Sequence, residues 1–296
     1  MAEQTIFERF LTINRRWIFL VLGLVVVIAL LLPPSADVRV TTPVIRFYQV
    51  IETSDPAKPL IIAVDTPPSG LPELEPMIVG ILQHCFKRSQ PVILLALQME
   101  GVSIAERLVE QVQSEYNARA AERGDTRRIK MGEDWALLGY RAGFSAVILG
   151  LGDDVRAVFP TDLYGNYLDE MPLFDDYHNY ADTAAVVDIS WSSTPELWVQ
   201  FAGGPFGVPI LVGCTAVSAP QYYAYLQTDQ MSGLLGGLKG AAEYEKLINE
   251  PASATRGMVA QTGAHLLIVI LIVLGNIAYF AIELRKRREK KKHQPH

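Results

Sequence analysis

Acidic and hydroxyl side chains follow several short apolar segments in the middle of this chain, where such segments would end as strands. In an open parallel sheet, ligands bind beyond the carboxyl ends of the strands. Convergence of these side chains in one crevice would create a ligand site. The alternative is that each one caps a helix or closes a turn. The residues concerned are Asp65, Asp153, Asp154, Asp188, Thr215 and Ser218.

A dinucleotide site is not expected, although Gly150-Leu151-Gly152 follows an apolar run. The dinucleotide fingerprint needs a third glycine three residues further on, where this chain has Val155. The carboxylates of Asp153 and Asp154 would also repel a pyrophosphate. We therefore predict structural glycines in a tight turn and no nucleotide cofactor; the cofactor, if one exists, is unknown.

A hydrolytic triad would need Ser218 or Cys214 as the nucleophile with His84 or His178 as the base. The Gly-x-Ser-x-Gly pattern of a nucleophile elbow does not occur in the sequence. No zinc site is predicted, because paired-cysteine spacing is also missing. Within the acidic segment 153–183, residues 162–182 suit a calcium site or, more simply, a solvated loop.

The two cysteines, Cys85 and Cys214, permit two interpretations. They would form one disulfide in an oxidising compartment, or remain two buried free thiols. The sequence does not decide between them.

Apolar runs alternate with helical patterns, which favours an α/β domain with a mostly parallel sheet and helices on both faces, a three-layer Rossmann-like fold. Runs without polar positions are typical of strands buried on both faces. The predicted strands are 60–64, 92–97, 146–149, 184–189 and 208–212. The predicted helices are 73–87, 103–123, 135–142, 195–201, 220–227 and 232–248. The helix 103–123 is expected to begin with a capping box at Ser103 and Glu106.

The predicted helix 232–248 is rich in glycine. Gly233, Gly236, Gly237 and Gly240 form two overlapping small-x-x-x-small pairs. Each glycine costs a helix about 1 kcal/mol relative to alanine. Such a face therefore indicates close approach of another backbone, either within the domain or at an interface.

Two uncharged apolar runs, 17–32 and 266–282, are nearly long enough to cross a bilayer as helices. Asn276 in the second run, beside Gly275, is suited to hydrogen bonding with another membrane helix. The predicted organisation is an N-terminus 1–16, a first span 17–34, a connector 35–58 with β-like pieces, an α/β domain 59–262, a second span 263–284 and a basic tail 285–296.

Charge predicts the orientation of these spans. Of 26 basic and 32 acidic residues, ten basic and four acidic residues lie in the two ends, leaving 16 and 28 between the spans. Lys and Arg near membrane ends stay in the cytoplasm, so both termini are expected there and the acidic domain outside. An acidic domain is an unsuitable partner for nucleic acid. The expected partners are the lipid bilayer and other membrane subunits or a second copy.

Part of the chain resembles a family of uncharacterised two-helix prokaryotic membrane proteins. The resemblance is carried by GCTAVSAPQYYAYLQTDQMSGLLGGLKGAAEYEKL, FPTDLYGNYLDEMP and VVDIS, within about 150–247. It implies that these segments belong together in one extracytoplasmic domain, and it implies no activity.

The leading interpretation is therefore a membrane-anchored extracytoplasmic binding or scaffold subunit of a membrane complex. The alternative is an extracytoplasmic hydrolase that uses the strand-end carboxylates, with or without a divalent cation. The first does not require an enzyme; the second requires the carboxylates to share one accessible cleft.

Overall fold

The computed structural model describes residues 12–31, 39–250 and 252–292. The chain forms two compact units, Asp37–Thr255 on the one hand and Met1–Ala36 with Arg256–His296 on the other. The first unit is an α/β domain and the second contains the two apolar helices.

The domain is built on one six-stranded sheet in the order β3-β2-β1-β4-β5-β6, and every neighbouring pair is parallel. The strand order changes direction between β1 and β4, which is the doubly wound arrangement of Rossmann-like domains. This confirms the predicted parallel α/β sheet, with one strand more than expected. The strands are β1 (Leu60–Asp65), β2 (Val92–Ala96), β3 (Trp135–Tyr140), β4 (Ala185–Ser190), β5 (Ile210–Cys214) and β6 (Gly233–Gly236).

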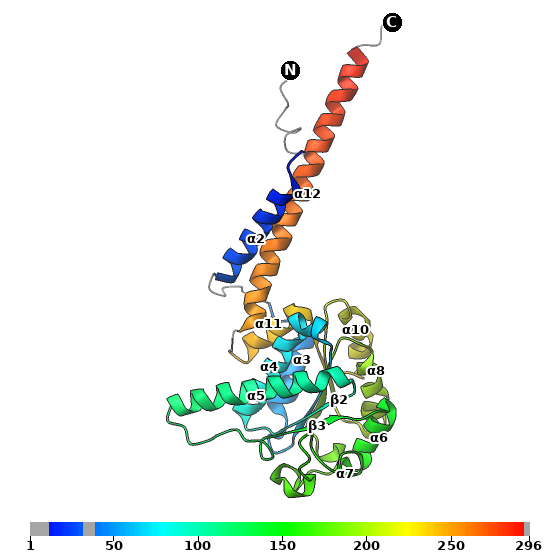
Figure 1. Cartoon of the computed structure of the whole chain (residues 1–296). Coiled ribbons are helices and arrows are strands. Elements are labelled where there is room, and N and C mark those ends of the chain that lie inside the picture. The colour runs from blue at the N-terminus through cyan, green and yellow to red at the C-terminus, as the bar shows by residue number, and fades with distance from the viewer. Residues whose placement is uncertain (1–11, 32–38, 251, 293–296) are drawn as a thin grey trace. The chain divides into compact units, whose positions relative to one another are not determined.

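Helices cover both faces of the sheet, as Figure 1 shows. On one face α3 (Thr42–Thr53), α4 (Leu71–Arg88), α5 (Met99–Glu122) and α11 (Gly237–Leu247) pack together. On the other lie α6 (Phe144–Asp153), α8 (Thr194–Trp198) and α10 (Ala219–Gln227). The shorter helices are α7 (Val155–Val158), α9 (Gly204–Phe206), a π-helix at Val199–Gly203 and 3₁₀ turns at Pro68–Gly70, Leu168–Glu170, Pro172–Phe174 and Tyr180–Asp182.

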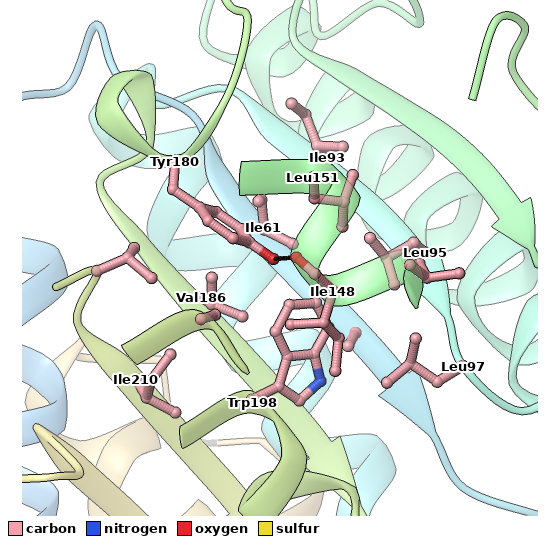
Figure 2. Packing of buried hydrophobic residues seen from close by; sticks show 14 of the residues in the cluster. Ile61, Ile93, Leu95, Leu97, Ile148, Leu151, Tyr180, Val186, Trp198 and Ile210 are labelled. Atoms are coloured by element: carbon pink, nitrogen blue, oxygen red, sulfur yellow. Dashed lines mark hydrogen bonds between the residues drawn. The ribbon is translucent and has the colours of Figure 1, made fainter. Parts of the chain in front are cut away.

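The core under α6 and α8 is apolar, and Figure 2 shows how it is filled. Ile61 and Val186 from the sheet pack with Ile148 of α6 and Trp198 of α8. The Tyr180 hydroxyl donates to the Ile148 carbonyl at 2.7 Å, which gives this buried tyrosine a partner. Burial on both faces explains why the strands read as unbroken apolar runs.

The predicted connector 35–58 is wrong in its secondary structure where the structure describes it, because its β-like residues form the helix α3. Pro43 stands in the first turn, and Val44, Phe47 and Ile51 recur at helical spacing and are buried. α3 packs on β6 within the domain. Tertiary burial of this stripe outweighs the strand preference of its β-branched residues.

Two neighbouring elements were predicted the wrong way round. Residues 135–142 were expected as a helix, but Trp135–Tyr140 is the edge strand β3, paired with β2. Residues 146–149 were expected as a strand, but they lie inside the helix α6, which buries Val147, Ile148 and Leu151. Short apolar runs fit either element, and the available strand position beside β2 decides the outcome.

The glycine-rich helix is corrected as well. Gly233 and Gly236 lie in the strand β6, and the helix α11 begins only at Gly237. A Cβ on Gly233 would lie 2.4 Å from Phe47 Cα, so α3 crosses β6 at backbone contact. The close approach predicted from these glycines occurs inside the domain. The predicted capping box is also wrong, because α5 begins one turn earlier, at Met99.

The second unit contains α2 (Arg15–Leu31) and most of α12 (Ser253–Lys292). The first three residues of α12, 253–255, belong to the α/β domain. Among the described residues, one helix is long and apolar enough to cross a membrane, at Ser253–Arg285. α2 has 17 residues and a length of about 26 Å, shorter than a hydrocarbon layer of about 30 Å. The first span 17–34 therefore stays a prediction, and its last residues lie outside the described ones.

Candidate functional site

Asp65 and Asp188 lie together at the carboxyl ends of β1 and β4, where the strand order reverses. Asp188 of β4 pairs with Ala63 of β1. Asp65 lies two residues beyond Ala63 on the same face of β1, which makes Asp65 the diagonal neighbour of Asp188. Both side chains are fully buried, with 0% exposure. Of the carboxylates predicted to converge, these two do.

The two carboxyl groups interact as a buried pair, and the interaction acts on the pKa of each. Asp65 Oδ1 accepts from the backbone amides of Leu97 at 2.6 Å and Gln98 at 3.0 Å. Asp188 Oδ2 accepts from the Thr194 hydroxyl at 2.8 Å. The remaining oxygens, Asp65 Oδ2 and Asp188 Oδ1, are buried without another partner, and a proton on Asp188 joins them.

Burial is the main reason that this proton is retained. Desolvation raises the pKa of Asp65 to about 7, against the opposing effect of the Leu97 and Gln98 amides. Desolvation, followed by the negative charge of Asp65, raises the pKa of Asp188 well above its usual range. At neutral pH the pair therefore holds at least one proton and a partial negative charge.

Hydroxyl groups extend the pair toward the surface. Thr194 Oγ1 also lies 2.8 Å from Ser190 Oγ, whose hydroxyl can donate to it, and the hydroxyls of Ser190 and Ser192 are 3.0 Å apart. The side-chain Nε2 of Gln98 donates to Ser192 Oγ at 2.8 Å. This network ties the loop after β4 to the loop after β2 above the buried carboxyl groups.

A crevice of about 470 Å³ opens at the same edge of the sheet, formed by the loops after β1, β4 and β5. Trp191 and Val217 are exposed at its wall, with 50% and 90% of their surface accessible. Thr215 Oγ1 and Ser218 Oγ, 3.1 Å apart, contribute hydroxyl groups. The side chains that bear on its chemistry are Ser69, Glu73, Trp191, Thr215, Val217 and Ser218.

Glu73 is held in position at this crevice by backbone contacts. It stands in the first turn of α4, and its Oε2 accepts from the Ala216 amide at 2.8 Å. Gly237, with φ +60°, allows this approach, because a Cβ there would lie 2.9 Å from that oxygen. The sequence analysis missed Glu73; its position two residues into a helix after a predicted strand was the available signal.

Asp153 and Asp154 do not join the pair. They end α6 and begin α7, and Asp154 accepts from the Arg156 amide as an N-cap. Gly152 is structural, because a Cβ there would lie 2.2 Å from the Phe206 ring. The expectation that these aspartates follow a strand was wrong because residues 146–149 are helical.

The rest of the acidic segment is built from turns. Asp162 Oδ1 accepts from the amides of Tyr164 and Asn166, and Asp169 pairs with Arg156. Among the described residues, no group of three His, Cys, Asp or Glu side chains is arranged to hold a metal ion. Asp65 and Asp188 present only two free oxygens between them, fewer than a hard cation needs.

The remaining reactive side chains do not line the crevice. Cys85 and Cys214 are both free and buried. His84 Nδ1 lies 2.7 Å from the Tyr244 hydroxyl and its Nε2 lies 2.7 Å from Glu52 Oε2. Desolvation lowers the pKa of His84, which favours the neutral ring between these partners. This histidine joins α3, α4 and α11, is almost completely buried and stacks on Tyr48.

Two further buried carboxylates, Glu243 and Glu245 of α11, hold the two ends of the domain. Glu243 Oε2 accepts from the amide and the hydroxyl of Thr41, directly before α3. Glu245 accepts from the amides of Ala252, Ala254 and Thr255, at the start of α12. Both are almost completely buried, and the sequence analysis did not single them out.

The buried carboxyl pair and the crevice differ in their access to solvent. Asp65 and Asp188 have the chemistry of an acid–base pair, but they lie beneath the loops and have no exposed surface. The crevice above them presents one carboxylate, an indole and hydroxyl groups. No protein family, curated protein or solved structure matches the chain.

Proposed function

We propose that this protein is a membrane-anchored binding subunit whose ligand enters the crevice beside Trp191. The observation that carries the proposal is the position of the crevice at the carboxyl ends of β1, β4 and β5, next to the reversal of strand order. An indole left half exposed there provides an apolar contact surface, and Thr215 and Ser218 provide polar contacts.

The helix α11 gives the crevice a mechanical link to both ends of the domain. Its first residue, Gly237, packs against Ala216 and Glu73 at the crevice. Further along, Glu243 holds Thr41, and Glu245 holds the first turn of α12. A ligand that displaces the loop at Ala216 therefore acts on α11, which contacts both ends of the domain. Such a link would let a binding subunit pass the presence of a ligand to its membrane helices.

The anchor includes α12 and, in this proposal, a first span at 17–34. Gly263 of α12 faces α2 closely, because a Cβ there would lie 3.3 Å from Val25 Cγ1 and 4.0 Å from Ala29 Cβ. Small residues at such a contact are typical of packed membrane helices. Asn276, whose Nδ2 donates to the Ile272 carbonyl at 2.9 Å, keeps its carbonyl oxygen for another helix.

The binding proposal is tested by blocking the crevice in the full chain, purified in a maltoside detergent. Saturation-transfer NMR would be recorded with four probes: choline, glucose, acetate and N-acetylglycinamide. We expect at least one probe to bind wild type and to be lost in Ser218→Trp, which fills the crevice. Gln221→Trp on exposed α10 is the matched control and should bind normally. Failure of all four probes, or equal binding to Ser218→Trp, would contradict the proposal.

The proposal also places both termini in the cytoplasm and the domain outside. This orientation is tested with single introduced cysteines, because the two native thiols are buried. Glu122→Cys places a thiol on the exposed surface of the domain, and Arg287→Cys places one after the second span. An impermeant maleimide applied to intact cells should label the first and spare the second. Labelling of Arg287→Cys alone would invert the topology.

Association through the membrane helices is tested by Asn276→Leu in the same detergent. We expect native mass spectrometry to find wild type in an oligomer or with a co-purifying membrane protein. The variant should show a smaller assembled fraction, because it loses the polar side chain of the span. A strictly monomeric wild type without a partner would count against a complex subunit.

A further inference from the structure

Two acidic features lie at or beneath the crevice: the Glu73 carboxylate and the buried pair of Asp65 and Asp188. Glu73 lines it directly, with one oxygen bound to the Ala216 amide. Beneath the loop after β4, the proton-sharing pair of Asp65 and Asp188 keeps a partial negative charge, and the Trp191 amide donates to the Asp65 carbonyl at 3.4 Å. Among the described side chains that line the crevice, none is basic.

Several backbone amides at this edge are already occupied, which leaves fewer of them to bind an anion. Helix N-termini attract anions through free amides. Here the amides of Ser218 and Ala219 at the start of α10 donate to the Thr215 carbonyl, and the Ala216 amide donates to Glu73. An anionic ligand would be repelled by the carboxylate of Glu73.

Trp191 supplies the second element of a cation site. Its side chain is 50% exposed at the wall of the crevice. The face of an indole attracts ammonium groups more strongly than any other aromatic side chain does. A carboxylate and an exposed indole in one small crevice form the combination that recognises a cation with apolar substituents.

We infer that the ligand of the Trp191 crevice is a small organic cation with an ammonium group, held between the Glu73 carboxylate and the Trp191 indole. This inference rests on the proposed binding function and adds the charge of the ligand. The cavity of about 470 Å³ lies within the range of small-molecule sites, roughly 300 to 1,000 Å³. The excess of acidic residues between the two spans, 28 against 16 basic ones, would also attract a cation.

The experiment compares choline with its uncharged carbon isostere, 3,3-dimethylbutan-1-ol, on the full chain in maltoside. Binding is followed by the fluorescence of Trp191, identified by subtraction of Trp191→Phe, and by calorimetry. We expect choline to bind at least tenfold more tightly than the alcohol. Glu73→Gln should weaken choline at least tenfold and leave the alcohol unchanged. Glu75→Gln, two residues away and paired with Arg107, is the matched control and should behave as wild type.

Trp191→Leu separates the indole face from simple burial, because leucine keeps an apolar wall and removes the aromatic ring. We expect it to weaken choline more than the alcohol. Equal affinity for both probes, insensitivity to Glu73→Gln, or no choline binding at about 10 mM would overturn the inference. Binding of glucose or N-acetylglycinamide that Ser218→Trp abolishes would leave the binding function intact and refute only the positive charge.

Discussion

Asp65 and Asp188, on adjacent parallel strands, face each other with one buried carboxyl oxygen each and a proton between them. Two ionised carboxylates that are both buried in one place would repel each other, which favours a protonated form of the pair in the folded state. The pair joins β1 to β4 at the reversal of strand order, directly under the loops that form the crevice.

The stability of the domain should fall as pH rises from about 4 to above 7, because of this pair. A carboxyl group with a raised pKa in the folded state contributes its stability fully below its unfolded pKa of about 4, and loses it as pH rises through the folded value. That folded pKa is about 7 for Asp65 and is also raised for Asp188.

Asp188→Asn should reduce this pH dependence, since an amide donates to Asp65 and accepts from Thr194 without a titrating proton, while Asp65 still titrates with a pKa raised by burial. We expect the variant to gain on the order of 2 kcal/mol relative to wild type between pH 5 and pH 8. The melting temperature in detergent at both pH values measures this. Asp175→Asn, at an exposed position, is the control. A constant difference between wild type and Asp188→Asn at all pH values would refute the shared proton.

His84 should give the opposite pH dependence of stability, with a loss as pH falls. Desolvation lowers its pKa in the folded state, so its contribution is present above an unfolded pKa of about 6.5 and is lost as pH falls below it. His84→Gln keeps a donor for Glu52 and an acceptor for Tyr244 without the charge. Between pH 7.5 and 5.5, wild type should lose stability relative to this variant. The exposed His178→Gln should follow wild type, and parallel behaviour of all three proteins would exclude the mechanism.

Gly101 should tolerate no side chain. A Cβ there would lie 1.7 Å from the Val64 carbonyl oxygen, so Gly101→Ala forces α5 away from β1. We expect a loss of about 3 kcal/mol, or failure to fold, measured as melting temperature and yield. Gly204→Ala is the control, since its Cβ would make an ordinary 3.5 Å contact with the Val199 carbonyl. Similar stability of both variants would show that the packing of α5 on β1 is different.

Cys85 and Cys214 should resist alkylation in the folded protein. Burial raises the pKa of each thiol to about 12, which leaves almost no reactive thiolate at neutral pH. Maleimide should label neither cysteine in the native chain and both after denaturation. If neither cysteine is labelled after denaturation without a reducing agent, the two thiols form a disulfide and the prediction is wrong.

Much of the sheet was predictable because its central strands have a local signature. The runs 60–64, 92–97 and 208–212 are apolar throughout, and 184–189 is apolar except for Asp188, which is typical of strands buried on both faces. All four occur in the structure, close to the predicted bounds. The edge elements carry no such signature. Residues 135–140 and 144–153 are both short and apolar, and only the space beside β2 determines which of them is the strand.

The candidate site was predictable only in part, for the same reason. Asp65 and Asp188 were expected near one edge because each closes an apolar run. Asp153 and Asp154 were grouped with them through the mistaken strand at 146–149. Glu73 and Trp191 acquire their meaning from loops that are distant in the sequence and meet at the crevice.

By itself, the sequence determined that a parallel α/β sheet would form, because uninterrupted apolar runs can be buried only where helices cover both of their faces. The tertiary structure alone decided that two aspartates 123 positions apart share a proton, that α3 is a helix and that the glycines of β6 meet α3. These outcomes depend on which surfaces come into contact, and the free energy of burying a group depends on neighbours that local sequence does not specify.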